Sequence, residues 1–234
     1  MTVLQDIQLH WFQKQTRAGA HENTRIRWKQ RGGAIIHVNS HPIHLREEAR
    51  GSSIFIHGGE SAPCFELELT GTHAILQDVL RRDHCFSDDH KEGRDIVRAA
   101  YLVAKESGIK TLELTDNSYI RCPQKIHLSN LSFLTTGQTW YESIIPGLRC
   151  TDIEDIELYR EKARTTTWRR VGAELIDIDI DVDIDAPGSA MLILDAMKRD
   201  KQFCWFFKKR MGRLLANSEI YDSLFGSHWE ATIV

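Results

Sequence analysis

The fold is decided in residues 92–115, which read EGRDIVRAAYLVAKESGIKTLELT. The first part carries apolar residues every three or four positions, a pattern that predicts an amphipathic helix. Those residues are Ile96, Val97, Ala100, Val103 and Ala104. Gly108 stands where the end of a helix often needs a left-handed backbone, and residues 111–115 read as a strand. Because a helix that ends in glycine and leads directly into a strand is typical of a crossover connection, we expect an α/β fold.

Four short runs before this segment predict a meander of antiparallel strands. Each is rich in β-branched or aromatic residues and is separated from the next by Gly, Ser, Asn or Pro. The runs cover residues 34–38, 43–45, 54–56 and 65–69. In the last run Glu66 and Glu68 alternate with apolar residues, so one face is expected to be apolar and the other wet. Residues 72–85 show apolar residues on one side, which predicts a helix capped by Thr72.

The segment after residue 115 predicts turns and short helical pieces. Residues 116–118 read DNS, and all three side chains can bond neighbouring backbone amides in a turn. Residues 128–134 are short and ambiguous between a helix and a strand. Residues 137–145 predict a helical turn that ends before Pro146.

The second half of the chain has a different pattern. Residues 151–170 alternate charges without a clear apolar stripe, residues 190–216 predict one long or two shorter helices, and residues 227–234 predict a strand. Residues 176–185 read IDIDIDVDID, which predicts a strand with five carboxylates on one face. This strand is either a site for a hard cation or a solvated edge strand. Same-face residues lie roughly 6.6 Å apart, which favours the solvated edge.

Length and composition indicate a globular chain. The 234 residues are 41% hydrophobic and 27% charged, which fits one domain or a domain with an appended lobe. We expect a core in residues 1–150 and a C-terminal extension in residues 151–234. No run is long and apolar enough to span a bilayer, and no signal-peptide pattern opens the chain, so a cytoplasmic, soluble protein is expected. The net charge of −3 gives no general attraction to nucleic acid or anionic membranes.

The cysteines and histidines predict neither a disulfide framework nor a metal site. Five cysteines are scattered without a CxxC spacing, so we expect free thiols in a reducing compartment. Eleven histidines are present, but His37, His41 and His44 lack the spacing of helical metal ligands. No metal is therefore expected.

The order of these elements resembles the GNAT superfamily of acyl-CoA-dependent N-acyltransferases. The shared order is an antiparallel meander, a turn into a helix, a strand, and a helical segment with an aromatic residue. The resembling parts are residues 35–69, 90–104, 112–114 and 140–145. Residues 112–118 and 137–142 are also similar to uncharacterised GNAT-like proteins of large DNA viruses. The resemblance implies a central mixed, mostly antiparallel sheet flanked by helices, with a helical C-terminal extension.

The resemblance also implies a cofactor turn and candidate catalytic residues. The turn would place His90, Gly93 and Arg94 around the pyrophosphate of acetyl-CoA at a helix N-terminus. Asp95, which stands where the family has Gly or Ala, is either a departure that repels the phosphates or an ordinary first-turn acid of a structural helix. Tyr141 would protonate the leaving thiolate, or it is a core aromatic.

Glu68 and Glu113 complete the candidate catalytic set, because either could act as general base if its strand faces a cleft. Alternatively, the alternation of apolar and polar residues along its strand makes each glutamate an exposed strand residue.

Two functions follow as hypotheses. The first is a GNAT-like protein, either an acetyl-CoA-dependent N-acyltransferase of unknown substrate or a catalytically degenerate relative. The alternative is a non-enzymatic structural or assembly protein, such as a virion component, that associates with itself or with protein partners.

Overall fold

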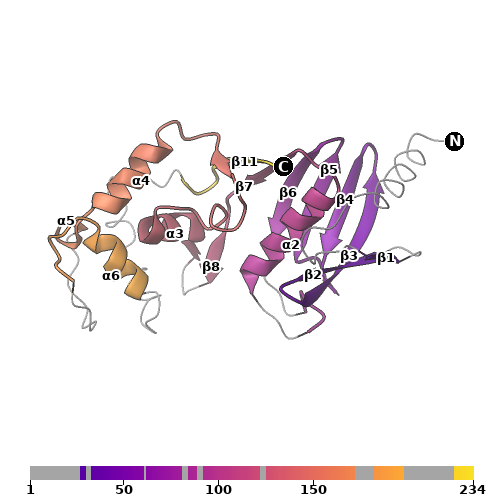
Figure 1. Ribbon diagram of the computed structural model, residues 1–234, viewed down its shortest axis with the longest axis horizontal. Coiled ribbons are helices and arrows are strands. Elements are labelled where there is room, and N and C mark those ends of the chain that lie inside the picture. The colour runs from indigo at the N-terminus through magenta and orange to yellow at the C-terminus, as the bar shows by residue number, and fades with distance from the viewer. Residues whose placement is uncertain are drawn as a thin grey trace. The chain divides into compact units, whose positions relative to one another are not determined.

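The computed structural model describes residues 27–29, 33–60, 62–80, 84–88, 92–121, 125–171, 182–197 and 224–234. The chain divides into two compact units (Figure 1). Unit 1 comprises Met1–Leu114 and Ala231–Val234, and unit 2 comprises Thr115–Glu230. The boundary expected at residue 150 falls inside unit 2.

Unit 1 contains the predicted meander. Its strands β1 to β6 pair antiparallel in chain order. They are β1 (Arg27–Lys29), β2 (Gly33–Val38), β3 (His41–Arg50), β4 (Ser53–Gly58), β5 (Phe65–Thr70) and β6 (His73–Val79). Strand β7 (Thr111–Thr115) then pairs with β6 in parallel, with Ala74 opposite Leu112. The predicted α/β class and the mixed, mostly antiparallel sheet are thereby confirmed.

Helix α2 (Gly93–Glu106) covers the apolar face of this sheet and forms the predicted crossover between β6 and β7. Figure 1 shows α2 lying along these strands. All five apolar residues that predicted the helix are buried, and they pack on a face that contains Ile36, Ile56 and Leu67. Gly108 has the expected left-handed backbone, with φ of 73°. Burial of these side chains is the main stabilisation of the helix, because an isolated helix of this length is marginal in water.

Residues 72–85 do not form the expected helix, because β6 occupies His73–Val79. Gly71 has a φ of 60° and, with Thr72, makes a two-residue turn that returns the chain beside β5. Ala74 and Leu76 are buried beneath α2, whereas Ile75 lies on the opposite face. Pairing with β5 and β7 therefore overrides the weak helical spacing of the sequence.

Unit 2 contains a two-stranded hairpin and four helices among the described residues. The hairpin joins β8 (Tyr119–Arg121) to β9 (Lys125–His127). Strand β10 (Arg149–Cys150) pairs antiparallel with β11 (His228–Thr232), whose last two residues belong to unit 1. The helices are α3 (Leu128–Thr136), α4 (Ile156–Thr165), α5 (Trp168–Val171) and α6 (Ser189–Met197). Helix α3 packs on α4 and α6 around Phe133, Leu134 and Leu194. The ambiguous residues 128–134 thus belong to a helix, and the predicted final strand is confirmed.

The predicted acidic strand is not found where the structure describes it. Residues 182–185 form coil and a turn, in which the Asp185 amide donates to Asp183. Residues 176–181 lie outside the described residues, as do residues 198–216 of the predicted C-terminal helices. Helix α6 confirms the beginning of those helices. In the part of the chain that the structure describes, no helix has the length and apolar character needed to cross a bilayer.

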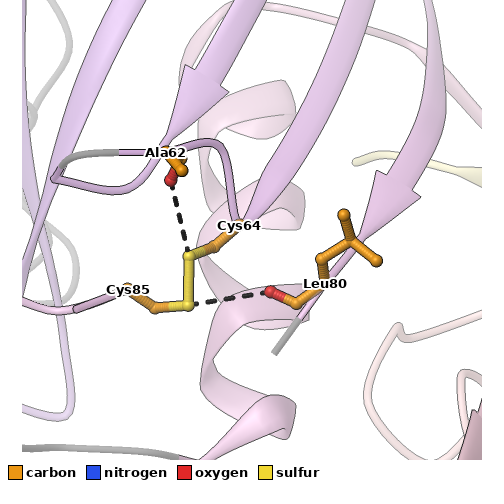
Figure 2. The surroundings of a disulfide bond; sticks show 4 residues. All are labelled: Ala62, Cys64, Leu80 and Cys85. Carbon is orange, nitrogen blue, oxygen red and sulfur yellow. Dashed lines mark hydrogen bonds between the residues drawn. A yellow bond between two sulfur atoms is a disulfide. The ribbon is translucent and has the colours of Figure 1, made fainter. Parts of the chain in front are cut away.

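The prediction that the cysteines are free thiols is wrong for two of them. Cys64, just before β5, and Cys85, after β6, form a disulfide (Figure 2). Sequence spacing does not reveal this pair, because the β5–β6 hairpin brings together residues that are 21 positions apart. Cys150 is a free thiol, and burial raises its pKa. Cys122 and Cys204 lie outside the described residues.

Candidate functional site

The predicted cofactor turn leads into α2. Gly93 is the first helical residue, Arg94 is exposed, and Glu92 precedes the helix in an extended conformation without capping it through its side chain. His90 lies outside the described residues. The turn therefore leads into the N-terminus of a helix. The first backbone amides of a helix and the helix dipole generally favour a nearby anion.

Asp95 supplies that negative charge from the protein itself. Its carboxyl is 4% exposed, and its Oδ1 accepts hydrogen bonds from Asn39 Nδ2 at 2.9 Å and Arg98 Nη1 at 2.9 Å. Asn39 reaches it from the tight β2–β3 turn, where its φ is 49°. Asp95 is thus more than an ordinary exposed first-turn acid, because it ties the start of α2 to a sheet turn. A phosphate placed at the same position would be repelled by this fixed carboxylate.

The two predicted general bases share one face of the unit 1 sheet. Glu68 is opposite Ile75, and Ile75 is opposite Glu113, so register places them on the same side two strands apart. Glu68 accepts hydrogen bonds from Ser53 Oγ at 2.9 Å and Gln77 Nε2 at 3.0 Å. Glu113 lies 3.4 Å from His73 Nε2. This face is opposite the one that α2 covers.

A chain of charged groups crosses the same face, and sequence reasoning missed its centre, His57. Arg50 donates two hydrogen bonds to Glu48, of 2.8 and 2.7 Å, and these contacts lower the pKa of Glu48. His57 Nδ1 lies 3.1 Å from Glu66, and His57 Nε2 lies 3.5 Å from Glu48. Neither ring nitrogen meets hydrogen-bond geometry despite these distances, so the contacts are ion pairs only when the ring is protonated. The period-two alternation of β4 could have placed His57 beside Glu66.

Tyr141 lies in unit 2, where its ring is 7% exposed and packs edge-on against Trp140, with centroids 5.1 Å apart. The next residue, Glu142, forms a reciprocal capping pair with Thr139. The Thr139 amide donates to Glu142 Oε2 at 2.8 Å, and the Glu142 amide donates to Thr139 Oγ1 at 3.4 Å. The predicted helical turn is thus confirmed as a capped turn that holds Tyr141 in the core of unit 2.

Arg160 of α4 completes this arrangement with a buried ion pair to Glu142. It also donates to the Gly137 carbonyl at 2.7 Å and to Glu157 at 2.9 Å. Burial alone would lower the pKa of Arg160, but the hydrogen bond and charge of Glu142 outweigh it and the pKa is raised. The charged residue on the buried side of α4 explains why the sequence showed no apolar stripe there.

Asp116 is a buried acid that follows β7. Its Oδ1 accepts hydrogen bonds from the amide and hydroxyl of Ser118, as the predicted turn chemistry requires, but its Oδ2 has no hydrogen-bond partner. Burial raises the pKa of Asp116 to about 6, against the opposing hydrogen bonds from Ser118. The sequence identified the turn at residues 116–118 but did not indicate that Asp116 is buried.

The structure therefore places the predicted residues at three locations. Gly93 and Arg94 are at the start of α2, Glu68 and Glu113 are on the opposite sheet face of unit 1, and Tyr141 is in the core of unit 2. Among the described residues, no group of three or more His, Cys, Asp or Glu is arranged to hold a metal ion. No protein-family model, curated protein or solved structure matches the chain.

Proposed function

We propose that this chain is a GNAT-like protein that has lost acyl-CoA chemistry and serves as a structural or assembly protein. The observation that carries the proposal is the buried Asp95 carboxylate, fixed by Asn39 and Arg98 in the first turn of α2. A carboxylate there supplies the helix N-terminus with the negative charge that a pyrophosphate would otherwise bring.

The GNAT-like part of the proposal is supported by the order of elements in unit 1. An antiparallel meander leads through α2 to β7, which pairs with β6 in parallel. This is the order that the resemblance implies.

The loss of catalysis is supported by what the candidate residues contact. Glu68 is hydrogen-bonded by Ser53 and Gln77 on the sheet face opposite α2. Tyr141 is buried next to a capped turn whose glutamate is paired with Arg160. Each residue thus has a packing or pairing role that accounts for its position without a substrate.

The competing hypothesis, an acetyl-CoA-dependent N-acyltransferase, retains one favourable observation. Gly93 begins α2 without a side chain, as close approach of a phosphate to the backbone would need. The two hypotheses make opposite predictions about whether acetyl-CoA binds.

Acetyl-CoA titration, followed by thermal shift and calorimetry, separates them. We expect no change in melting temperature at millimolar acetyl-CoA or CoA. A ligand at 100 times its Kd would stabilise the folded state by about 2.7 kcal/mol. A clear stabilisation that is abolished by Gly93→Asp and retained in Glu92→Gln would overturn the proposal.

The assembly role is tested by light scattering on the full chain after size exclusion. Self-association or co-purification of a defined protein partner is expected. A strictly monomeric protein that also catalyses acetyl transfer to amines would contradict the role.

A further inference from the structure

The disulfide between Cys64 and Cys85 joins the loop before β5 to the segment that precedes α2 in the chain. Cys64 ends the loop between β4 and β5, and Cys85 lies in residues 84–88, a segment that precedes Glu92 and the start of the helix. Both cysteines are 1% exposed. Figure 2 shows the bond between the two loops, next to Ala62 and Leu80.

Residues 84–88 are also held to the sheet by contacts that do not depend on the disulfide. The Ser87 amide donates to the Pro42 carbonyl at 2.9 Å, and the Glu60 amide donates to the His84 carbonyl at 3.3 Å. His41 Nδ1 lies 2.7 Å from Asp88 Oδ2. Reduction of the disulfide would therefore remove one of several attachments and leave the others in place.

The surroundings of the two sulfurs fit the reduced state as well as the oxidised one. Cys64 Sγ lies 3.8 Å from the Ala62 carbonyl oxygen, and Cys85 Sγ lies 3.7 Å from the Leu80 carbonyl oxygen (Figure 2). In the disulfide these are contacts without a hydrogen. After reduction each thiol has a carbonyl acceptor at hand, so no buried thiol donor is left unsatisfied.

Backbone restraints at Gly59 and Cys64 act on the loop in addition to the disulfide. Gly59 has a φ of 136°, and a Cβ added there would lie 2.4 Å from the Ala62 carbonyl oxygen. The Cys64 amide also donates to the Gly58 carbonyl at 2.6 Å. Backbone geometry thus holds Cys64 in position for the bond to form again.

We propose that Cys64 and Cys85 form a reversible redox clamp on the segment that leads into α2. A dithiol reductant, used as the exchange partner, would attack one sulfur through its thiolate and form a mixed disulfide. Its second thiol would then release the protein as two thiols. The protein disulfide gains two electrons and two protons, and the reductant becomes a disulfide.

Opening the clamp loosens residues 84–88 and the loop before β5 while the sheet and α2 remain folded. Because the cysteines are buried, exchange requires local opening of these two segments and not global unfolding. The clamp therefore couples the thiol redox state to the order of residues 84–88, the described segment that precedes α2 in the chain. It is independent of whether any cofactor binds there.

Peptide mapping of the native chain without reductant provides the first test. We expect a linked pair of peptides that contain Cys64 and Cys85, which separates after dithiothreitol into two alkylated peptides. Two free, alkylated cysteines in the protein purified under oxidising conditions would overturn the proposal.

Hydrogen exchange with and without dithiothreitol tests the clamp itself. Faster exchange is expected in residues 60–64 and 84–88 after reduction, with protection of α2 and β2–β6 retained, and the original pattern is expected to return with oxidised glutathione. The melting temperature should fall by roughly 5 °C or more, as expected for loss of a cross-link of this loop length. Unchanged exchange in both segments, or global loss of protection, would refute a reversible clamp.

Variants separate the clamp from other thiol effects. Cys64→Ser and Cys85→Ser should each show the reduced exchange pattern and lose the response to dithiothreitol. Cys150→Ser should keep the wild-type response. A folded Cys64→Ser protein that still responds to dithiothreitol would contradict the proposed clamp. If the serine variants fail to fold, the wild-type comparison with and without dithiothreitol tests the clamp by itself.

Discussion

Asp95 in unit 1 and Glu142 in unit 2 are acids that lie at turns, and the carboxylate of each is largely withdrawn from solvent. Asp95 is held by an amide and by Arg98, whose side chain is half exposed. Glu142 is held by a backbone amide and by Arg160, which is itself buried. The difference lies in the cation, which is half exposed beside Asp95 and buried beside Glu142. Because removal of one partner from a buried ion pair leaves an uncompensated charge, we expect disruption of the Glu142 pair to cost more.

Asp116 extends this comparison because it is buried without a cationic partner. Its Oδ2 lacks a hydrogen bond, and burial raises its pKa to about 6. Glu142, by comparison, accepts a hydrogen bond from the Arg160 guanidinium. The three acids form a series from fully paired to half paired, and each can be perturbed separately.

The largest effect is expected for Arg160→Met, which keeps the aliphatic stem and leaves Glu142 buried without a counter-charge. The free energy of unfolding should fall by about 3–5 kcal/mol, measured by urea denaturation. Arg164→Met on the exposed side of the same helix is the control, and a change within about 0.5 kcal/mol is expected. Equal effects in the two variants would show that the buried pair contributes nothing specific.

The titration of Asp116 is expected to change the free energy of unfolding by about 3 kcal/mol as the pH varies. Its folded-state pKa of about 6 exceeds the ordinary value of 3.8, so its contribution to stability is full below pH 3.8 and is lost as pH rises through 6. Asp116→Asn should therefore be more stable than wild type at pH 7 and show a flatter stability profile between pH 4 and 7. Asp155→Asn, at an exposed position, is the matched control. A wild-type profile identical to that of Asp116→Asn would disprove the raised pKa.

A smaller loss, about 1–3 kcal/mol, is expected for Asp95→Ala, because the Asn39 amide loses its acceptor. The effect should localise to the β2–β3 turn and the first turn of α2 in hydrogen exchange. Glu92→Ala, which lies one turn earlier and is exposed, should change neither the free energy of unfolding nor the hydrogen exchange of these two turns. An Asp95→Ala protein as stable as wild type would show that Asp95 is not an anchor.

The smallest effect is expected for Thr139→Ala, which removes one side of the capping pair and leaves the Glu142–Arg160 ion pair. A loss of about 1 kcal/mol is typical of such a cap. Thermal unfolding of Thr139→Ala, Arg160→Met and the double variant measures their coupling. Strictly additive losses would indicate that the cap does not position Glu142 for Arg160.

The sequence predicted those parts of the fold in which burial follows a regular period. The apolar spacing from Ile96 to Ala104 and the turn at Gly108 predicted α2 and its connection to β7 correctly. Strands β2 to β5 of the meander were also predicted, because each alternates or is short and bounded by turn residues, whereas β1 and β6 were not.

The missed elements have specific physical causes. Strand β6 was predicted as a helix because the sequence does not show that β5 and β7 flank it. Helix α4 was not recognised because its buried residues are Arg160 and Ala163, which make no apolar stripe. The arginine is tolerated there because Glu142, Glu157 and the Gly137 carbonyl accept its hydrogen bonds. The free-thiol prediction failed at Cys64 and Cys85 because their distance depends on the hairpin between them.

The residues of the candidate site also divide into features that the sequence determined and features that only the tertiary structure decided. The sequence by itself determined which residue types stand at the start of α2 and on the strands. The resemblance to the GNAT superfamily singled out Gly93 and Asp95, and alternation placed Glu68 and Glu113 on their strands. Only the tertiary structure decided that Asp95 is bound to Asn39, that Glu142 is bound to Arg160, and that Asp116 is fully buried. The reason is that periodicity reports which face a residue occupies, whereas the partner, the burial and the pKa depend on segments far apart in the chain.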